Sequence, residues 1–85
     1  MLIVLPSPGD TRKASAWLTE QAIAHEIIPI PDSLNYRTGS DIALVLTATN
    51  KDDNMDVPMK LSRERFVVMR VFRDFDWPPL QGVAL

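Results

Sequence analysis

Two short, continuous apolar runs constrain this chain more than any other feature. Leu2–Leu5 opens the sequence and is followed by Pro6, and Ile42–Leu46 lies near its middle. A short apolar run between turn residues is typical of a strand that is buried on both faces. The chain has 85 residues, which is enough for one domain, over 1–85, with one small core. We therefore predict a buried strand at 2–5 and a central strand at 42–46.

The first half of the chain predicts a helix and an edge strand between these two runs. Asp10 suits a helix N-cap, and the apolar spacing after it predicts an amphipathic helix over 11–23. Residues 25–30 favour an edge strand, because Pro29 and its neighbour Pro31 have no amide donor. The polar stretch 32–40 follows as a long loop.

The second half is more ambiguous. Residues 49–58 are polar and contain Pro58, so we predict a surface loop. The segment 62–75 suits a strand on propensity, but a helical arrangement with Ser62 as N-cap separates its apolar and basic residues. We therefore predict a helix over 62–75 and a last strand over 80–85, with a strand at 66–72 as the alternative.

This order of elements predicts an α+β fold of the ferredoxin-like, split β-α-β type. In this two-layer sandwich, written βαββαβ, one antiparallel sheet carries both helices on a single face. The alternative strand at 66–72 would leave a smaller βαβ core.

Composition and charge exclude several classes of function. A net charge of −2 and a pI near 5.1 speak against binding to nucleic acid or to anionic membranes. The apolar opening is too short for a signal peptide or a membrane span, so we expect a cytoplasmic protein. The chain has no cysteine, which excludes disulfides, thiolate metal sites and cysteine nucleophiles.

Two segments are candidates for a small binding site. The turn 6–10, with Ser7 and Gly9, joins a strand to a helix N-terminus, where backbone amides can hold an anion. The loop 35–41, with Arg37, Thr38 and Gly39, could meet this turn at one end of the sheet. Against an anion, Asp10 would cap the same amides and repel it.

The sequence holds no catalytic or metal motif. Asp52, Asn54 and Asp56 begin like a calcium loop, but the glycine and the final glutamate of that motif are missing. His25 is the only histidine, and Glu26 beside it in a strand points to the other face, so adjacency predicts no dyad. We expect no enzyme, no catalytic residue, no metal and no cofactor.

The predicted second helix has a basic side. Lys60, Arg63, Arg70 and Arg73 would share it, as a solvated face or as a contact for an acidic partner. Phe66 and Met69 lie off its apolar arc, so an exposed pair there would suit a partner or dimer contact.

Residues 2–46 resemble the selenium/sulfur carrier protein-like family, whose small domains are mostly of unknown function. The resemblance is carried by Leu2-Ile3-Val4-Leu5-Pro6-Ser7, by Ala14 and Leu18, by Ile28-Pro29-Ile30-Pro31 with Leu34, and by Gly39 before Ile42-Ala43-Leu44. It implies a Cys-Gly pair before the central strand, from which that family is thought to carry sulfur or selenium. Thr38 stands where the cysteine would be, and a threonine hydroxyl cannot hold a persulfide.

These observations predict a small, non-enzymatic protein-interaction domain, with the loop 35–41 as its main contact region. The partner is an unidentified protein or a second copy of the chain, since a homodimer would cover a free sheet face or edge. The alternative is a domain that binds a small ligand or anion through 6–10 and 35–41.

Overall fold

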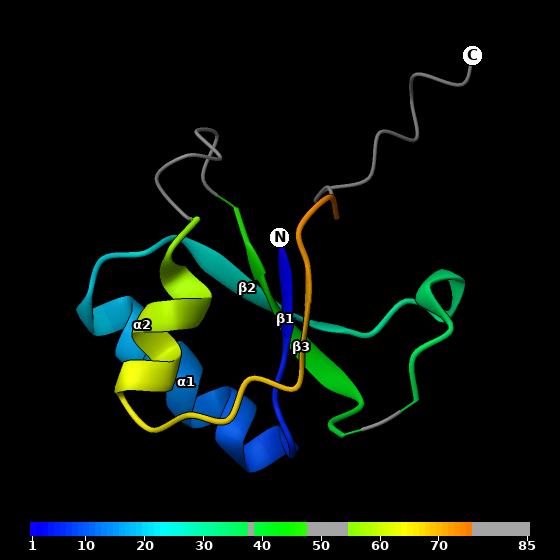
Figure 1. The fold of residues 1–85 in the computed structure, drawn as a ribbon, viewed down its shortest axis with the longest axis horizontal. Helices are drawn as coiled ribbons and strands as arrows, with labels where there is room; N and C mark the ends of the chain where they lie inside the picture. Colours follow the sequence, from blue (N-terminus) through cyan, green and yellow to red (C-terminus); the bar gives the residue numbers. More distant parts are fainter. Residues whose placement is uncertain (38, 48–54, 76–85) are drawn as a thin grey trace.

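One four-stranded antiparallel sheet and two helices make up this small α+β structure (Figure 1). The computed structural model describes residues 1–37, 39–47 and 55–75. The elements in chain order are β1 (Leu2–Val4), α1 (Pro8–Glu20), β2 (His25–Pro29), the 3-10 helix η1 (Asp32–Leu34), β3 (Ile42–Leu46), α2 (Val57–Arg63) and β4 (Arg70–Phe72). The strands lie in the order β2-β3-β1-β4, and every neighbouring pair is antiparallel.

The two apolar runs form the interior strands, as predicted. β1 pairs with β3 on one side, where Leu2 faces Val45, and with β4 on the other, where Leu2 faces Phe72. All three residues of β1 are completely buried. A strand with neighbours on both sides and cover on both faces needs apolar side chains at every position, which explains the unbroken run.

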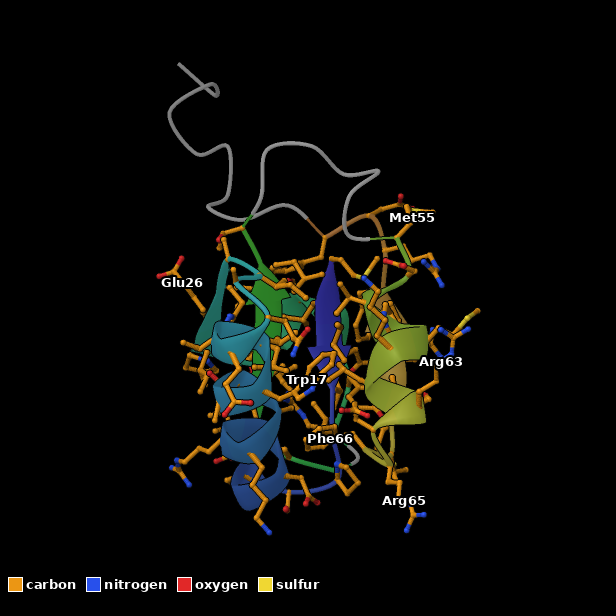
Figure 2. All side chains as sticks on the ribbon, turned by 90° about the vertical axis from the view of Figure 1, so that its left-hand side faces the viewer. Trp17, Glu26, Met55, Arg63, Arg65 and Phe66 are labelled. Atoms are coloured by element: carbon orange, nitrogen blue, oxygen red, sulfur yellow. The ribbon has the colours of Figure 1, made fainter. Side chains whose placement is uncertain are left out.

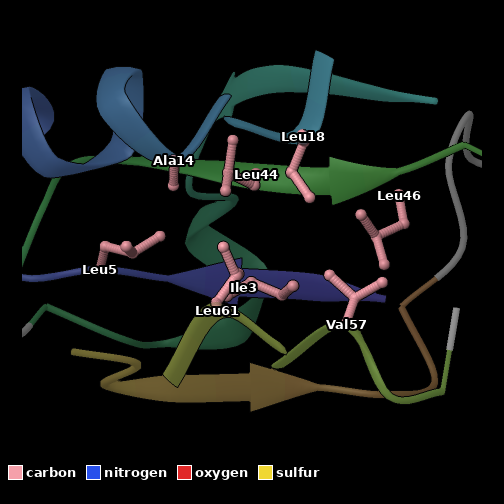
Figure 3. Close-up of a cluster of buried hydrophobic side chains, with 8 residues drawn as sticks. All are labelled: Ile3, Leu5, Ala14, Leu18, Leu44, Leu46, Val57 and Leu61. Carbon is pink, nitrogen blue, oxygen red and sulfur yellow. The ribbon is translucent and has the colours of Figure 1, made fainter. Parts of the chain in front are cut away.

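The helices cover one face of the sheet. Ile3 and Leu5 from the β1 segment meet Leu18 of α1 and Leu61 of α2 in the main core (Figure 3). α1 packs through buried residues spaced three and four apart, which is the period of a helix face. The eight buried residues of this cluster are Ile3, Leu5, Ala14, Leu18, Leu44, Leu46, Val57 and Leu61.

The opposite face of the sheet has a core of its own. Leu2 and Val4 point to this side, and Leu34 and Tyr36 from the segment after β2 pack over them. Figure 1 shows this segment, with η1, on the side of the sheet away from the helices. The rings of Tyr36 and Phe72 meet edge to face at 5.8 Å between centroids. The chain thus covers part of the face for which we had expected a dimer partner.

β2 is an edge strand, as the prolines predicted. Ile30 donates its amide to Asp41 O at 3.0 Å, and Thr47 donates to Ala24 O at 3.2 Å. Because these bonds alternate along an antiparallel pair, the even-numbered residues of β2 bond to β3 and Pro29 faces outward. The proline therefore removes no bond from the ladder, and it leaves this edge without a donor at that position.

α1 begins three residues earlier than predicted. Ser7, not Asp10, is the N-cap, and its Oγ accepts a hydrogen bond from the Asp10 amide at 3.1 Å. Pro8 occupies the first helical position, where its missing amide costs nothing. The helix ends at Glu20, because Ala22 takes a left-handed conformation with φ of 57° and Ile23 donates to Leu18 O.

The prediction of a helix over 62–75 is wrong. α2 starts at Val57, with Pro58 in its first turn, so the proline that indicated a loop in fact begins a helix. It ends just after Arg63, because Arg65 is left-handed and Phe66 donates to Leu61 O at 3.0 Å.

β4 takes up part of the stretch that we had placed in that helix. Residues 70–72 pair with β1, so the alternative strand at 66–72 was correct for its last three residues. Most of the predicted loop 49–58 and all of the predicted strand 80–85 lie outside the described residues.

Because both helices end on a left-handed residue with a side chain, we expect Ala22→Gly to stabilise the protein. Glycine relieves about 1–2 kcal/mol of left-handed strain and loses part of it to unfolded-state entropy, for a net gain of about 0.5–1 kcal/mol. Ala16 is exposed in the middle of α1, so Ala16→Gly should destabilise by about 1 kcal/mol. Urea unfolding of both variants measures the two changes. If both variants changed the free energy of unfolding in the same direction, the left-handed helix end at Ala22 would be contradicted.

Candidate functional site

The strand–helix turn and the loop after β2 meet at one end of the sheet, as predicted. Ser40 donates its amide to Leu5 O at 3.0 Å, so the chain just after Gly39 is fastened to the end of the β1 segment. Gly39 has φ of 86°, and a Cβ built on it would lie 3.0 Å from Leu5 O and 3.7 Å from Pro6 Cα. This close approach requires glycine.

The turn itself is occupied by its own side chains. Ser7 Oγ donates to Asp10 Oδ2 at 3.0 Å while it accepts from the Asp10 amide. Thr11 donates both its amide and its Oγ1 to Ser7 O. Gly9 lies within the first turn of α1. The Asp10 carboxylate thus lies at the helix N-terminus, where an incoming anion would meet a negative charge.

Arg37 forms an ion pair with the carboxylate of Asp32. Its Nη1 lies 3.1 Å from Asp32 Oδ1, and both side chains are exposed. The two residues border a shallow hollow of about 270 Å³, lined by Ile30, Asp32, Tyr36, Arg37, Gly39, Ser40 and Asp41. Two carboxylates and one paired guanidinium give this hollow no positive character. Thr38, the fifth candidate residue, lies outside the described residues.

The three arginines of the predicted basic face do not share a helix. Arg63 ends α2, and Arg70 lies in β4 with its guanidinium 5.3 Å from the Phe72 ring centroid. Arg73 follows β4 and donates from Nη1 to Met55 O at 3.5 Å. The single basic stripe was therefore a wrong prediction, because it assumed a continuous helix.

Two of these arginines nevertheless approach one exposed apolar surface. Arg63 Nη2 lies 3.5 Å from the Sδ of Met59, which is one turn earlier in α2. Arg73 donates to the backbone oxygen of Met55, just before the helix. Met55 and Met59 are 52% and 59% exposed. We call Met55, Met59, Arg63 and Arg73 the methionine–arginine surface. Figure 2 shows Arg63 on the outer side of α2 and Met55 next to the start of this helix.

α2 holds this surface in a fixed position. Val57 and Leu61 are buried in the main core on the inner side of the helix. Trp17 of α1 donates from Nε1 to Glu64 Oε1 at 3.0 Å, and Figure 2 shows Trp17 directed between the two helices. Phe66 packs against the same core, whereas Met69 is exposed, so the two do not form the exposed pair that would have suited a partner or dimer contact.

Ser15 and His25 form a contact that we had not predicted. Ser15 Oγ lies 2.6 Å from His25 Nε2, and His25 Nδ1 lies 2.8 Å from Ile23 O. A carbonyl oxygen only accepts, so Nδ1 carries the hydrogen, and Nε2 of the neutral ring accepts from the serine hydroxyl. The sequence suggested only Glu26, the next residue, as a partner for His25. Ser15 lies ten residues earlier on a helix, so no local sequence pattern linked it to His25.

This pair has part of the geometry of a nucleophile and its base. Hydrolysis of an ester or amide also needs amide donors for the developing oxyanion. Ser15 lies in the middle of α1, where the helix commits each backbone amide to a carbonyl four residues earlier. The contact is better explained as a link that fastens α1 to the start of β2.

Neither a metal centre nor a membrane segment is found in the described part of the chain. Within 1–37, 39–47 and 55–75, no group of three His, Cys, Asp or Glu residues could hold a metal ion. No helix in the same ranges has the length and apolar character needed to cross a membrane. Of the calcium-like residues, Asp56 occupies the N-cap position of α2 without a side-chain capping bond and pairs with Lys60 at 3.5 Å, and Asp52 and Asn54 lie outside these ranges.

No protein-family model, no curated protein and no solved structure shows a significant match to the chain. The resemblance to the selenium/sulfur carrier protein-like family therefore stays a prediction.

We expect Gly39→Ala and Gly9→Ala to change stability in opposite directions. At Gly39 the added methyl group meets Leu5 O in a left-handed backbone, which should destabilise by more than about 1 kcal/mol. At Gly9 the nearest atom is Ser7 Oγ at 3.8 Å, and alanine in the helix should stabilise by about 0.4–1 kcal/mol. Thermal unfolding of the two variants decides this, and a neutral Gly39→Ala would argue against the close approach.

We expect Ser15→Ala to be less stable than Ser62→Ala by about 1 kcal/mol, because only Ser15 has a side-chain partner whose hydrogen bond is lost. Ser62 is the matched control, since it is exposed and also lies in a helix. Urea unfolding measures the difference. Incubation with a fluorophosphonate should leave Ser15 unlabelled, and labelling that depends on His25 would overturn the structural role.

Proposed function

We propose that this chain is a small, non-enzymatic protein-interaction domain and that the methionine–arginine surface is its contact site. The observation that supports this most is the exposure of Met59 on α2 and of Met55 just before it, while the other side of this helix is anchored in the core. Fully burying an exposed methionine side chain contributes roughly 1.5–3 kcal/mol. Met55 and Met59 are 52% and 59% exposed, so a partner that covers them would gain about half of this for each.

The composition of the surface also favours a protein partner. Methionine and arginine are enriched in protein interfaces, whereas lysine and aspartate are depleted there. Methionine is flexible and polarisable, so it adapts to a partner of imperfect shape. Because α2 is held by Val57, Leu61 and the Trp17–Glu64 hydrogen bond, its backbone loses little freedom on binding.

The alternative function is binding of a small ligand or anion by the turn 6–10 and the loop 35–41. The meeting of these segments at Gly39 and Leu5 speaks for it. The carboxylate of Asp10 at the helix N-terminus and the pairing of Arg37 with Asp32 speak against an anion there. A phosphate-induced thermal shift that Arg37→Ala abolishes and Arg12→Ala preserves would support this alternative.

We also propose that the fold belongs to the ferredoxin-like class. The element order β-α-β-β-α-β and the position of both helices on one sheet face support this proposal. We propose a cytoplasmic location, which is supported by the absence of cysteine from the sequence.

The experiment that tests the contact site uses photoreactive methionine in place of the four methionines of the chain. Cross-links to a partner in living cells should map to positions 55 and 59, because these side chains would lie inside the interface. Met69 is the internal control, since it is 40% exposed but lies against Gly39, away from α2.

The double variant Met55→Ser/Met59→Ser should lose the partner without a large change in unfolding temperature. A cross-linked second copy of the chain would identify a homodimer. If the partner remains in the double variant, or if cross-links map only to position 69, the methionine–arginine surface is not the contact site.

A further inference from the structure

We infer, on the premise of the proposed interaction function, that the methionine–arginine surface binds an acidic amphipathic segment of another protein. Apolar side chains of that segment would cover Met55 and Met59, and its carboxylates would pair with Arg63 and Arg73. Two features of the surface carry this inference, namely the partners that the arginines have and the charge around them.

Arg63 and Arg73 each make a weak hydrogen bond within the domain. Arg63 Nη2 contacts Met59 Sδ, and a thioether is a poor acceptor. Arg73 Nη1 contacts Met55 O at 3.5 Å, at the outer limit for a hydrogen bond. Within the described ranges neither guanidinium has a carboxylate at salt-bridge distance, whereas Arg37 and Lys60 each have one. These contacts orient the two guanidinium groups, but the acceptors are uncharged and do not neutralise them.

Two guanidinium groups lie at the exposed methionines. Lys60 pairs with Asp56 at the edge of the surface, and Arg63 and Arg73 contact Met59 and Met55. The chain as a whole carries −2. A guanidinium can bind a carboxylate through two parallel hydrogen bonds, so each arginine offers a directional site for an acidic side chain.

The apolar part of the surface discriminates between acidic partners. A nucleic-acid backbone also supplies negative charge, but it would leave Met55 and Met59 against a charged strand and would meet an acidic chain. An amphipathic segment presents carboxylates and apolar side chains one helical turn apart. This spacing matches Met59 and Arg63, which also lie one turn apart on α2.

The test is selection of random peptides, about a dozen residues long, displayed on phage against the full chain. We expect the enriched sequences to combine aspartate or glutamate with leucine, isoleucine or phenylalanine at helical spacing. The selected peptide, made synthetically and labelled, should bind Arg63→Glu/Arg73→Glu at least about tenfold more weakly than the unaltered chain in fluorescence anisotropy. Binding should also weaken as salt is raised.

The matched control is Arg12→Glu/Lys13→Glu, which changes the net charge by the same amount on exposed positions of α1. It should bind the peptide nearly as well as the unaltered chain. Equal weakening by both double variants would overturn the inference, because the effect would then follow net charge. Circular dichroism of both variants confirms that each is folded.

Other outcomes separate this inference from the function on which it rests. Selected peptides that are apolar but uncharged, and that lose binding to Met55→Ser/Met59→Ser, would refute the acidic partner and leave the contact site standing. Tighter binding of a labelled single-stranded DNA of the same length would refute a protein segment. If no peptide is enriched, the acidic partner falls, and the methionine cross-links then decide the interaction function separately.

Discussion

The fold depends on the complete burial of β1. This strand, Leu2–Val4, hydrogen-bonds to β3 and to β4, and its side chains alternate between the core under the helices and the core under Tyr36 and Phe72. Each fully buried apolar side chain contributes roughly 1.5–3 kcal/mol, which matters in a chain that can bury so little surface. β3 and β4 pair with this strand and the two helices cover one of its faces, while β2 joins the sheet through β3.

The position of the candidate site follows from the way in which α2 covers β1. The helix is short, so two buried residues, Val57 and Leu61, and their neighbours commit its inner side. Its outer side is then free to carry Met59 and Arg63, and the turn after β4 brings Arg73 to the same place from another element. The buried residues that stabilise the fold and the residues of the proposed contact site therefore lie on opposite sides of α2, so substitutions can test them separately.

Sequence reasoning succeeded where the signal was local and failed where tertiary pairing decided. The runs at 2–5 and 42–46 and the prolines of β2 were correctly interpreted, because burial and donor loss leave direct marks in the residues. The segment 62–75 was misassigned, since a helical wheel can sort apolar from basic residues even where the chain is extended. The left-handed residue after α2 is Arg65 and not a glycine, so nothing in the sequence marked where this helix ends.

The same limits applied to the candidate site. Arg63 was predicted to share one helix face with Arg70, and this grouping was wrong, because Arg70 lies in β4 with its guanidinium over the Phe72 ring. The meeting of Gly39 with the strand–helix turn could be predicted from topology. The Ser15–His25 contact joins a helix to a strand, and it could only be found once α1 was placed against β2.

The central place of β1 also has a consequence for how the chain is made. β1 is synthesised before both of its hydrogen-bond partners, β3 and β4, so its ladder stays incomplete until β4 has also emerged from the ribosome. Contacts so distant in sequence form slowly, and the Leu2–Leu5 run is exposed in the meantime. The strand on which the finished fold depends most is therefore the one that waits longest for its partners during synthesis.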